Sequence, residues 1–173
     1  MTQQTTTQML LAILEDTLVG EFRAYEALVR LTKDERRLLP DGDVTALLAL
    51  IGQKERLLDE IDHLEHKRQM TLAEWARLEG RVAPPANLLS MLPELDALVA
   101  RRLGHLRDGI LALIEQQRDL ARGNKLLVNQ ALQQIQAVRD FLINLCDTPR
   151  GYQPSGLAGP AYTRVTVAVE QMA

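Results

Sequence analysis

The sequence contains almost none of the residue types on which disulfide-rich or nucleic-acid-binding proteins depend. It holds one cysteine, Cys146, in 173 residues, so no disulfide can form within the chain and a reducing compartment is indicated. Its 20 Lys and Arg are outnumbered by 23 Asp and Glu, with a net charge of -3. The chain therefore has no basic excess for binding phosphates, and we expect no nucleic-acid partner.

Long hydrophobic runs are also missing. A membrane-spanning helix needs roughly 18 or more apolar residues in succession, and the most apolar stretch, residues 126–146, is interrupted by charged and amide side chains. The N-terminal stretch lacks the positive charge that precedes the apolar core of a secretory signal. These features predict a cytoplasmic protein with no segment inserted in a membrane.

Motifs that carry catalysis are scarce too, since no phosphate-binding glycine loop, nucleophile elbow or HExxH helix occurs. Glu60 and His63 have the Glu-x-x-His spacing of di-iron bundles, but the second motif is missing because Arg102 stands three residues before His105. We therefore predict no enzymatic activity, no metal site and no cofactor, and a metal–carboxylate bundle enzyme is the least favoured alternative. The three histidines are His63, His66 and His105.

What the sequence does contain is helical periodicity. Prolines divide it into three long proline-free segments, each with apolar residues three and four positions apart, which is the pattern of an amphipathic helix. We predict an all-α fold with helices at about 4–39, 43–80 and 93–147. The turn residues Pro40 to Asp43 make the first two helices an antiparallel hairpin, with Asp43 as an N-terminal cap and Gly80 as a C-terminal one.

The lengths of these helices do not match. At 1.5 Å per residue the third helix is about 80 Å long, whereas each hairpin arm is about 55 Å long. Either the third helix breaks at Gly104, Gly109 or Gly123 and folds back into a four-helix bundle, or its end projects past the hairpin. The sequence leaves both alternatives open.

The end of the third helix is apolar on more than one face, so something must cover it. If the helix projects, we expect this stretch to bind an amphipathic helix of another protein. If the helix folds back, the same residues belong to the core. The candidate binding residues are Leu132, Ile135, Val138, Phe141, Leu142 and Leu145.

Residues 148–173 differ from the preceding domain, which we place at residues 1–147. Their first half is rich in proline and glycine, which predicts a flexible tether. The last stretch, 161–173, alternates like a β-strand but also has apolar residues at helical spacing, and such a short segment is marginally stable alone. We expect it to contribute to partner binding or to compete with it.

The order of motifs along most of the chain resembles the FlgN-type family of flagellar type III export chaperones. The resemblance rests on the helix-entry motif at Tyr25 to Leu38, the stretch Lys54 to Leu58, Arg68, the stretch Asn124 to Val128, and Tyr152 with Gly156. It implies a cytoplasmic chaperone that holds unassembled hook–filament junction proteins and hands them to the export gate, a membrane protein. It further implies that Tyr152 contacts this gate. The alternative is that Tyr152 packs on the third helix.

A different class of function uses the same apolar stretch. In a homo-oligomeric coiled-coil adaptor, a second copy of the chain would cover it. A chaperone that forms a homodimer when empty is compatible with both interpretations, and the sequence does not separate them.

Overall fold

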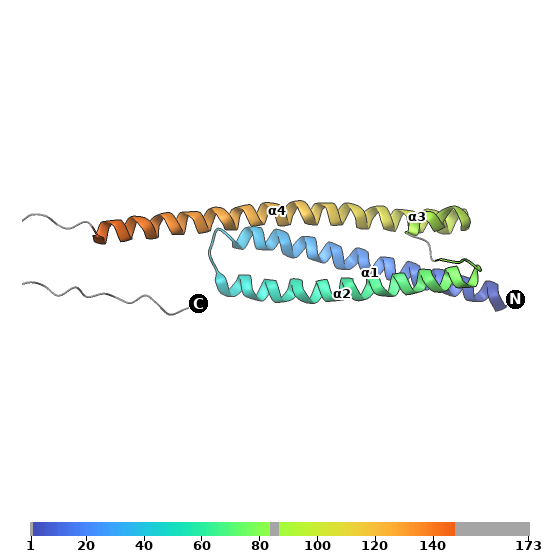
Figure 1. Cartoon of the computed structure of the whole chain (residues 1–173). Helices are drawn as coiled ribbons and strands as arrows, with labels where there is room; N and C mark the ends of the chain where they lie inside the picture. The colour runs from blue at the N-terminus through green and yellow to red at the C-terminus, as the bar shows by residue number, and fades with distance from the viewer. Residues whose placement is uncertain (1, 84–86, 148–173) are drawn as a thin grey trace, which may run out of the picture. The chain divides into compact units, whose positions relative to one another are not determined.

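A computed structural model describes residues 2–83 and 87–147, and all regular structure within these ranges is helical (Figure 1). The elements are α1 (Thr2–Leu38), α2 (Val44–Leu78), α3 (Leu88–Met91), the 3-10 helix η1 (Leu92–Glu94) and α4 (Ala97–Asp147). The all-α prediction is therefore confirmed. The chain divides into two compact units, residues 1–134 and 135–173.

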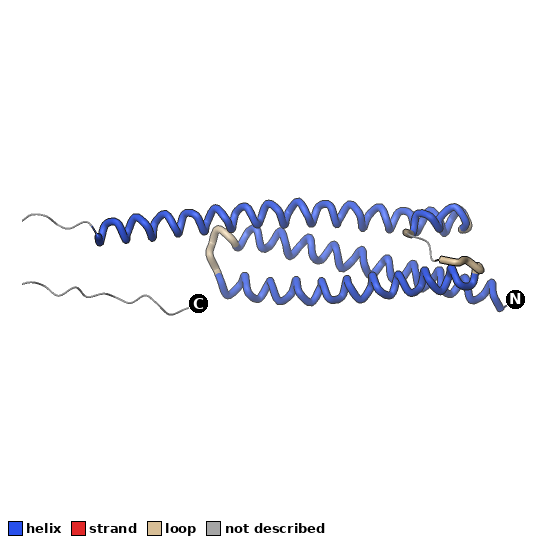
Figure 2. Tube along the Cα trace, in the orientation of Figure 1, coloured by secondary structure: helices blue, strands red, loops and turns tan. Residues whose placement is uncertain are grey.

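Helices α1 and α2 form the predicted hairpin within the first unit, joined by a short turn (Figure 2). The Oδ1 atom of Asp43 accepts a hydrogen bond from the amide of Ala46 at 3.0 Å, which satisfies a free donor at the start of α2. Gly42 and Gly80 both have positive φ, at 65° and 69°, which glycine adopts without strain. The predicted cap at Asp43 is confirmed.

The first stretch of α4 lies beside α1 and runs parallel to it. Glu15 pairs with Arg102 at 3.1 Å, and Arg36 donates to Asn124 at 3.0 Å. Residue numbers therefore rise together along the two helices. Helix α2 runs in the opposite direction, since Glu21 pairs with Arg68 and Glu35 pairs with Lys54.

The main core lies where α1, α2, α3 and α4 meet. Met91 and Leu103 have 0% exposure there, so the short α3 contributes as much to this core as the long helices. A second and smaller cluster joins α1 to α2 farther along the hairpin, through Ala24, Leu28 and Ile61. The main cluster consists of Leu14, Leu18, Leu72, Trp75, Ala76, Leu88, Met91, Leu103 and Ile110.

The structure corrects the sequence interpretation at the start of the third helix. Pro93 lies in η1, and α4 begins at Ala97 because the side chain of Asp96 accepts a hydrogen bond from the amide of Leu98 at 2.9 Å. The sequence did not predict α3, which is too short for its periodicity to be detected.

Helix α4 continues without interruption through Gly104, Gly109 and Gly123. A four-helix bundle that folds back at Gly123 is therefore wrong. The glycines have other surroundings: Gly109 and Gly123 lie directly against side chains of α1.

Candidate partner-binding surface

Among the side chains of α4 whose burial is described, Asn124 is the last buried one, with 4% exposure. Its Nδ2 donates to the carbonyl oxygen of Thr32 at 2.9 Å and to Oε2 of Glu35 at 2.7 Å, and its Oδ1 accepts from Nε of Arg36 at 3.0 Å. Lys54 of α2 donates to the same Oε2 of Glu35 at 3.0 Å. We call these five residues the Asn124 clamp, because they join α1, α2 and α4 through hydrogen bonds rather than apolar contacts.

Gly123 allows the close approach of α1 at the clamp. A Cβ atom at this position would collide with Nη2 of Arg36. The same Nη2 donates to the carbonyl oxygen of Leu120 at 3.4 Å. Gly123 therefore leaves room for the guanidinium that contacts both Leu120 and Asn124.

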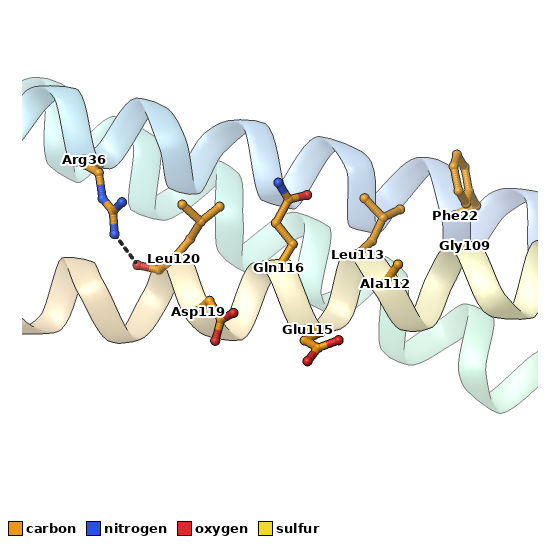
Figure 3. A pocket seen from close by; sticks show the side chains of 9 residues that line it. All are labelled: Phe22, Arg36, Gly109, Ala112, Leu113, Glu115, Gln116, Asp119 and Leu120. Carbon is orange, nitrogen blue, oxygen red and sulfur yellow. Dashed lines mark hydrogen bonds between the residues drawn. The ribbon is translucent and has the colours of Figure 1, made fainter.

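Before the clamp, an open groove of about 710 Å³ lies between α1 and α4. Figure 3 shows Leu113, Gln116 and Leu120 pointing toward α1, whereas Glu115 and Asp119 point away from it. The groove begins where Phe22 contacts Gly109 and extends to Arg36. Helix α4 is thus held on α1 by the apolar core at one end and by the clamp at the other.

A second polar link crosses the hairpin near the core. Nε of Arg68 donates to Oε1 of Glu21 at 2.8 Å, and the Glu21 side chain is only 3% exposed. Burial raises the pKa of Glu21, Arg68 counteracts this effect, and the charge of Glu65 adds to it. Burial and Glu65 also raise the pKa of Tyr25, whose hydroxyl donates to Glu65 at 3.3 Å.

Beyond the clamp the surroundings of α4 change completely. Every side chain described from Lys125 to Leu145 is exposed. Among them are the six candidate binding residues, whose exposure lies between 51% and 65%. Leu132 belongs to the first unit and the other five to the second. We call the six the distal apolar face: Leu132, Ile135, Val138, Phe141, Leu142 and Leu145.

The distal apolar face is broad. Successive residues of an α-helix turn by about 100°, so the six side chains cover roughly half of the helix circumference. Gln133, Gln136, Asp140 and Asn144 lie on the other half. An amphipathic helix with an uncovered apolar side is typical of a protein that binds another helix.

Other candidate chemistry has less support in the structure. The described residues contain no group of three or more His, Cys, Asp or Glu side chains that could hold a metal ion. No helix within these ranges is long and apolar enough to cross a membrane. Tyr152 and the segment 161–173 lie outside the described residues, so their predicted roles remain predictions.

The fold and this surface define a class: an all-helical protein whose last long helix leaves an apolar side uncovered. Comparison with protein families identifies the particular family, because the chain matches FlgN, described as FlgN protein, over residues 9–159. The chain belongs to the FlgN family, a family of flagellar export chaperones that bind flagellar proteins and are not known as enzymes. This confirms the resemblance found in the sequence. Comparisons with curated proteins and with solved structures found no match.

Several motifs behind the resemblance occur in the polar links. Arg68 pairs with buried Glu21, Lys54 pairs with Glu35, and Asn124 is the centre of the clamp. Sequence analysis did not predict these contacts, since each joins residues far apart in the chain. A polar residue on a mostly apolar seam, as at Asn124, was the available signal.

Proposed function

We propose that this protein is a cytoplasmic chaperone whose distal apolar face binds the assembly helix of unassembled flagellar hook–filament junction proteins. It then delivers them to the type III export gate. The observation that carries the proposal is the exposure of all six residues of the face on an uninterrupted helix. Membership of a flagellar export chaperone family supports it.

The energetics favour reversible binding. Complete burial of one Leu, Ile or Phe side chain contributes roughly 1.5–3 kcal/mol, and these six are already about half buried by their own helix. Together they offer about 5–9 kcal/mol, whereas association costs about 4 kcal/mol or more in lost freedom. The six residues alone therefore support weak binding, which suits a chaperone that must release its client.

The test is a pair of charged substitutions on the face, Ile135→Glu with Phe141→Glu. A carboxylate would have to be desolvated in the complex, so we expect affinity for a purified junction protein to fall by roughly a hundredfold or more. Titration calorimetry measures the affinity, and far-ultraviolet circular dichroism measures the helix content, which should not change.

The matched control places the same charges on the polar side of the same helix, as Gln133→Glu with Asn144→Glu. We expect this variant to bind the junction protein with an affinity close to that of the natural chain. Equal affinities for the two double variants would contradict the assignment of the face.

The C-terminal tail has a separate role in the proposal. Residues 148–173 act as a tether outside the helical domain of residues 1–147, and Tyr152 on this tether contacts the export gate. An aromatic side chain is an efficient anchor for such a contact. We expect Tyr152→Ala to lose binding to the cytoplasmic part of the gate and to keep binding to the junction protein; retained gate binding would remove Tyr152 from the proposal.

A truncation tests the division of the chain as a whole. Pull-down of the purified junction protein should succeed with the full chain and fail when residues 126–173 are removed. Removal of residues 148–173 alone should keep client capture. Loss of capture with this shorter truncation would transfer the binding site to the tail.

The exposed face also favours one alternative, a homo-oligomeric coiled-coil adaptor, because a second copy could cover the same residues. Sedimentation equilibrium distinguishes the two. A chain that is monomeric across a wide concentration range argues against the adaptor, whereas a tight dimer that the junction protein cannot dissociate argues for it.

A further inference from the structure

The end of α1 and the exposed stretch of α4 meet at the Asn124 clamp. Arg36, which donates to Asn124, lies in the last turn of α1, since this helix ends at Leu38. From Lys125 onward, the described side chains of α4 are exposed. Helix α1 therefore covers α4 up to the clamp and no farther.

One apolar seam of α4 runs through both stretches. Seven residues make about two helical turns, so successive positions seven apart differ by only about 20° around the helix axis. A partner helix that binds this seam beyond the clamp can extend toward the N-terminal end of α4 only by taking the place of α1. The positions concerned are Leu103, Ile110, Gln117, Asn124, Ala131, Val138 and Leu145.

Just before the clamp, the contact between α1 and α4 is open to solvent on one side. A groove of about 710 Å³ lies along one side of the contact between α1 and α4, from Phe22 to Arg36. The hydrogen bonds of Asn124 are different, because Thr32, Glu35 and Arg36 of α1 supply all three of them. An apolar partner helix in the place of α1 would leave the amide of Asn124 buried and unpaired, which is unfavourable.

We propose that Asn124 is a positioning residue that stops a bound partner helix from displacing the end of α1. This inference rests on the proposed function, because it assumes a helical client on the distal apolar face. A polar residue on an apolar seam restricts which helices pair and in which register. The clamp thus sets the inner limit of the binding surface.

Hydrogen exchange of the full chain, followed by mass spectrometry, tests the proposal with a purified junction protein as the probe. In the natural chain, we expect the probe to slow exchange in residues 126–145 and to leave residues 28–38 unchanged. In Asn124→Leu the seam is apolar from Leu145 back to position 124, the position that follows Gln117 on the seam. The probe should then accelerate exchange in residues 28–38 and bind about tenfold more tightly, since it gains apolar contacts.

Gln117→Leu is the matched control. Gln117 occupies the same seam seven residues earlier, and its Oε1 is buried without a hydrogen-bond partner among the described residues. This variant makes the seam equally apolar but breaks no contact of the clamp. We expect the probe to leave exchange in residues 28–38 unchanged, as in the natural chain.

Gly123→Ala weakens the clamp through Arg36 rather than through Asn124. Alanine is the better helix former, but its Cβ would displace the guanidinium of Arg36 from Asn124. We expect the same acceleration in residues 28–38 on addition of the probe, to a smaller extent. This variant keeps the proposal testable even if Asn124→Leu folds poorly.

The outcomes separate the two proposals. The role of Asn124 is overturned if the probe accelerates hydrogen exchange of residues 28–38 in the natural chain. It is also overturned if the probe accelerates this exchange in neither Asn124→Leu nor Gly123→Ala. No slowing of residues 126–145 in the natural chain contradicts the proposed function instead. In that case, exchange measured without the probe tests the role of Asn124. Residues 28–38 should exchange about tenfold faster in Asn124→Leu than in Gln117→Leu. Equal exchange rates in the two variants would refute this role.

Discussion

The two stretches of α4 on either side of the clamp have the same kind of sequence in opposite surroundings. In Ala97 to Asn124 the apolar seam is covered by the rest of the first unit, and Leu103 has 0% exposure. In Lys125 to Leu145 every described side chain is exposed, and Leu132 has 51% exposure. The comparison shows that one helical pattern stabilises the fold where the chain supplies a neighbour, and leaves its apolar side chains exposed where the chain supplies none.

Exposure alone does not distinguish the proposed binding surface from the rest of this protein. Helix α2 also has exposed apolar residues, among them Val44, Leu48 and Leu58. These residues form one narrow line with charged positions beside it, whereas the distal apolar face covers about half of its helix. The breadth of the apolar side therefore distinguishes α4 from α2.

The largest effect is expected from truncating the covered seam. Leu103→Ala removes a fully buried side chain and leaves a cavity, so the free energy of unfolding should fall by about 2–5 kcal/mol. Leu132→Ala, in the exposed stretch of the same helix, should change it by about 0.5 kcal/mol or less. Urea denaturation measures both. If both substitutions lowered the free energy of unfolding equally, Leu132 would have to be covered in solution.

The next effect comes from the buried ion pair that borders the covered seam. Arg68→Met leaves the carboxylate of Glu21, only 3% exposed, without its partner. We expect a loss of about 2 kcal/mol at pH 7, less than for a fully buried pair because Arg68 keeps 25% exposure. Arg77→Met is the control, since the pair of Arg77 with Glu74 is largely exposed. The stability of this variant should hardly change. Equal losses of stability in the two variants would contradict the special role of Glu21.

The pH dependence of the same variant has a definite sign. Burial raises the pKa of Glu21 in the folded protein above its ordinary value of 4.5, so the folded state binds this proton more tightly than the unfolded state. The contribution of Glu21 to stability therefore decreases as the pH rises from about 4.5 through the raised pKa. Arg68→Met raises this pKa further, and its destabilisation should be smaller at pH 5 than at pH 7.

The smallest effects distinguish two glycines within the covered stretch. A Cβ at Gly104 would make an ordinary contact with Leu92 at 3.6 Å, so Gly104→Ala should stabilise the protein by about 0.5–1 kcal/mol through helix propensity. A Cβ at Gly109 would lie 2.8 Å from Cε2 of Phe22. Gly109→Ala should therefore lower the melting temperature, whereas Gly104→Ala raises it. A higher melting temperature for Gly109→Ala would show that α1 does not contact α4 closely at Phe22.

The long helices were predictable from the sequence because their signals are local. Apolar spacing, the turn at Pro40 to Asp43 and the cap at Asp43 each involve residues within a few positions of one another. The start of α4 was placed too early because Pro93 is equally compatible with a 3-10 turn. The apolar character of the distal face was also visible in the sequence, since it depends only on composition and helical period.

The sequence could not show which of these surfaces are covered. Leu88 and Met91 lie in a connection with no periodicity, yet they are core residues because distant helices pack on them. Gly123 was equally compatible with a break, and its actual surroundings depend on Arg36, far away in the chain.

By itself the sequence determined an all-helical chain with one side of its last helix unusually apolar, since helix formation and amphipathicity arise from neighbouring residues. Only the tertiary structure decided that α4 stays unbroken and that its cover ends at Asn124. Burial depends on how far each partner helix reaches, and α1 ends at Leu38, so the uncovered length of α4 is a property of the packed helices together.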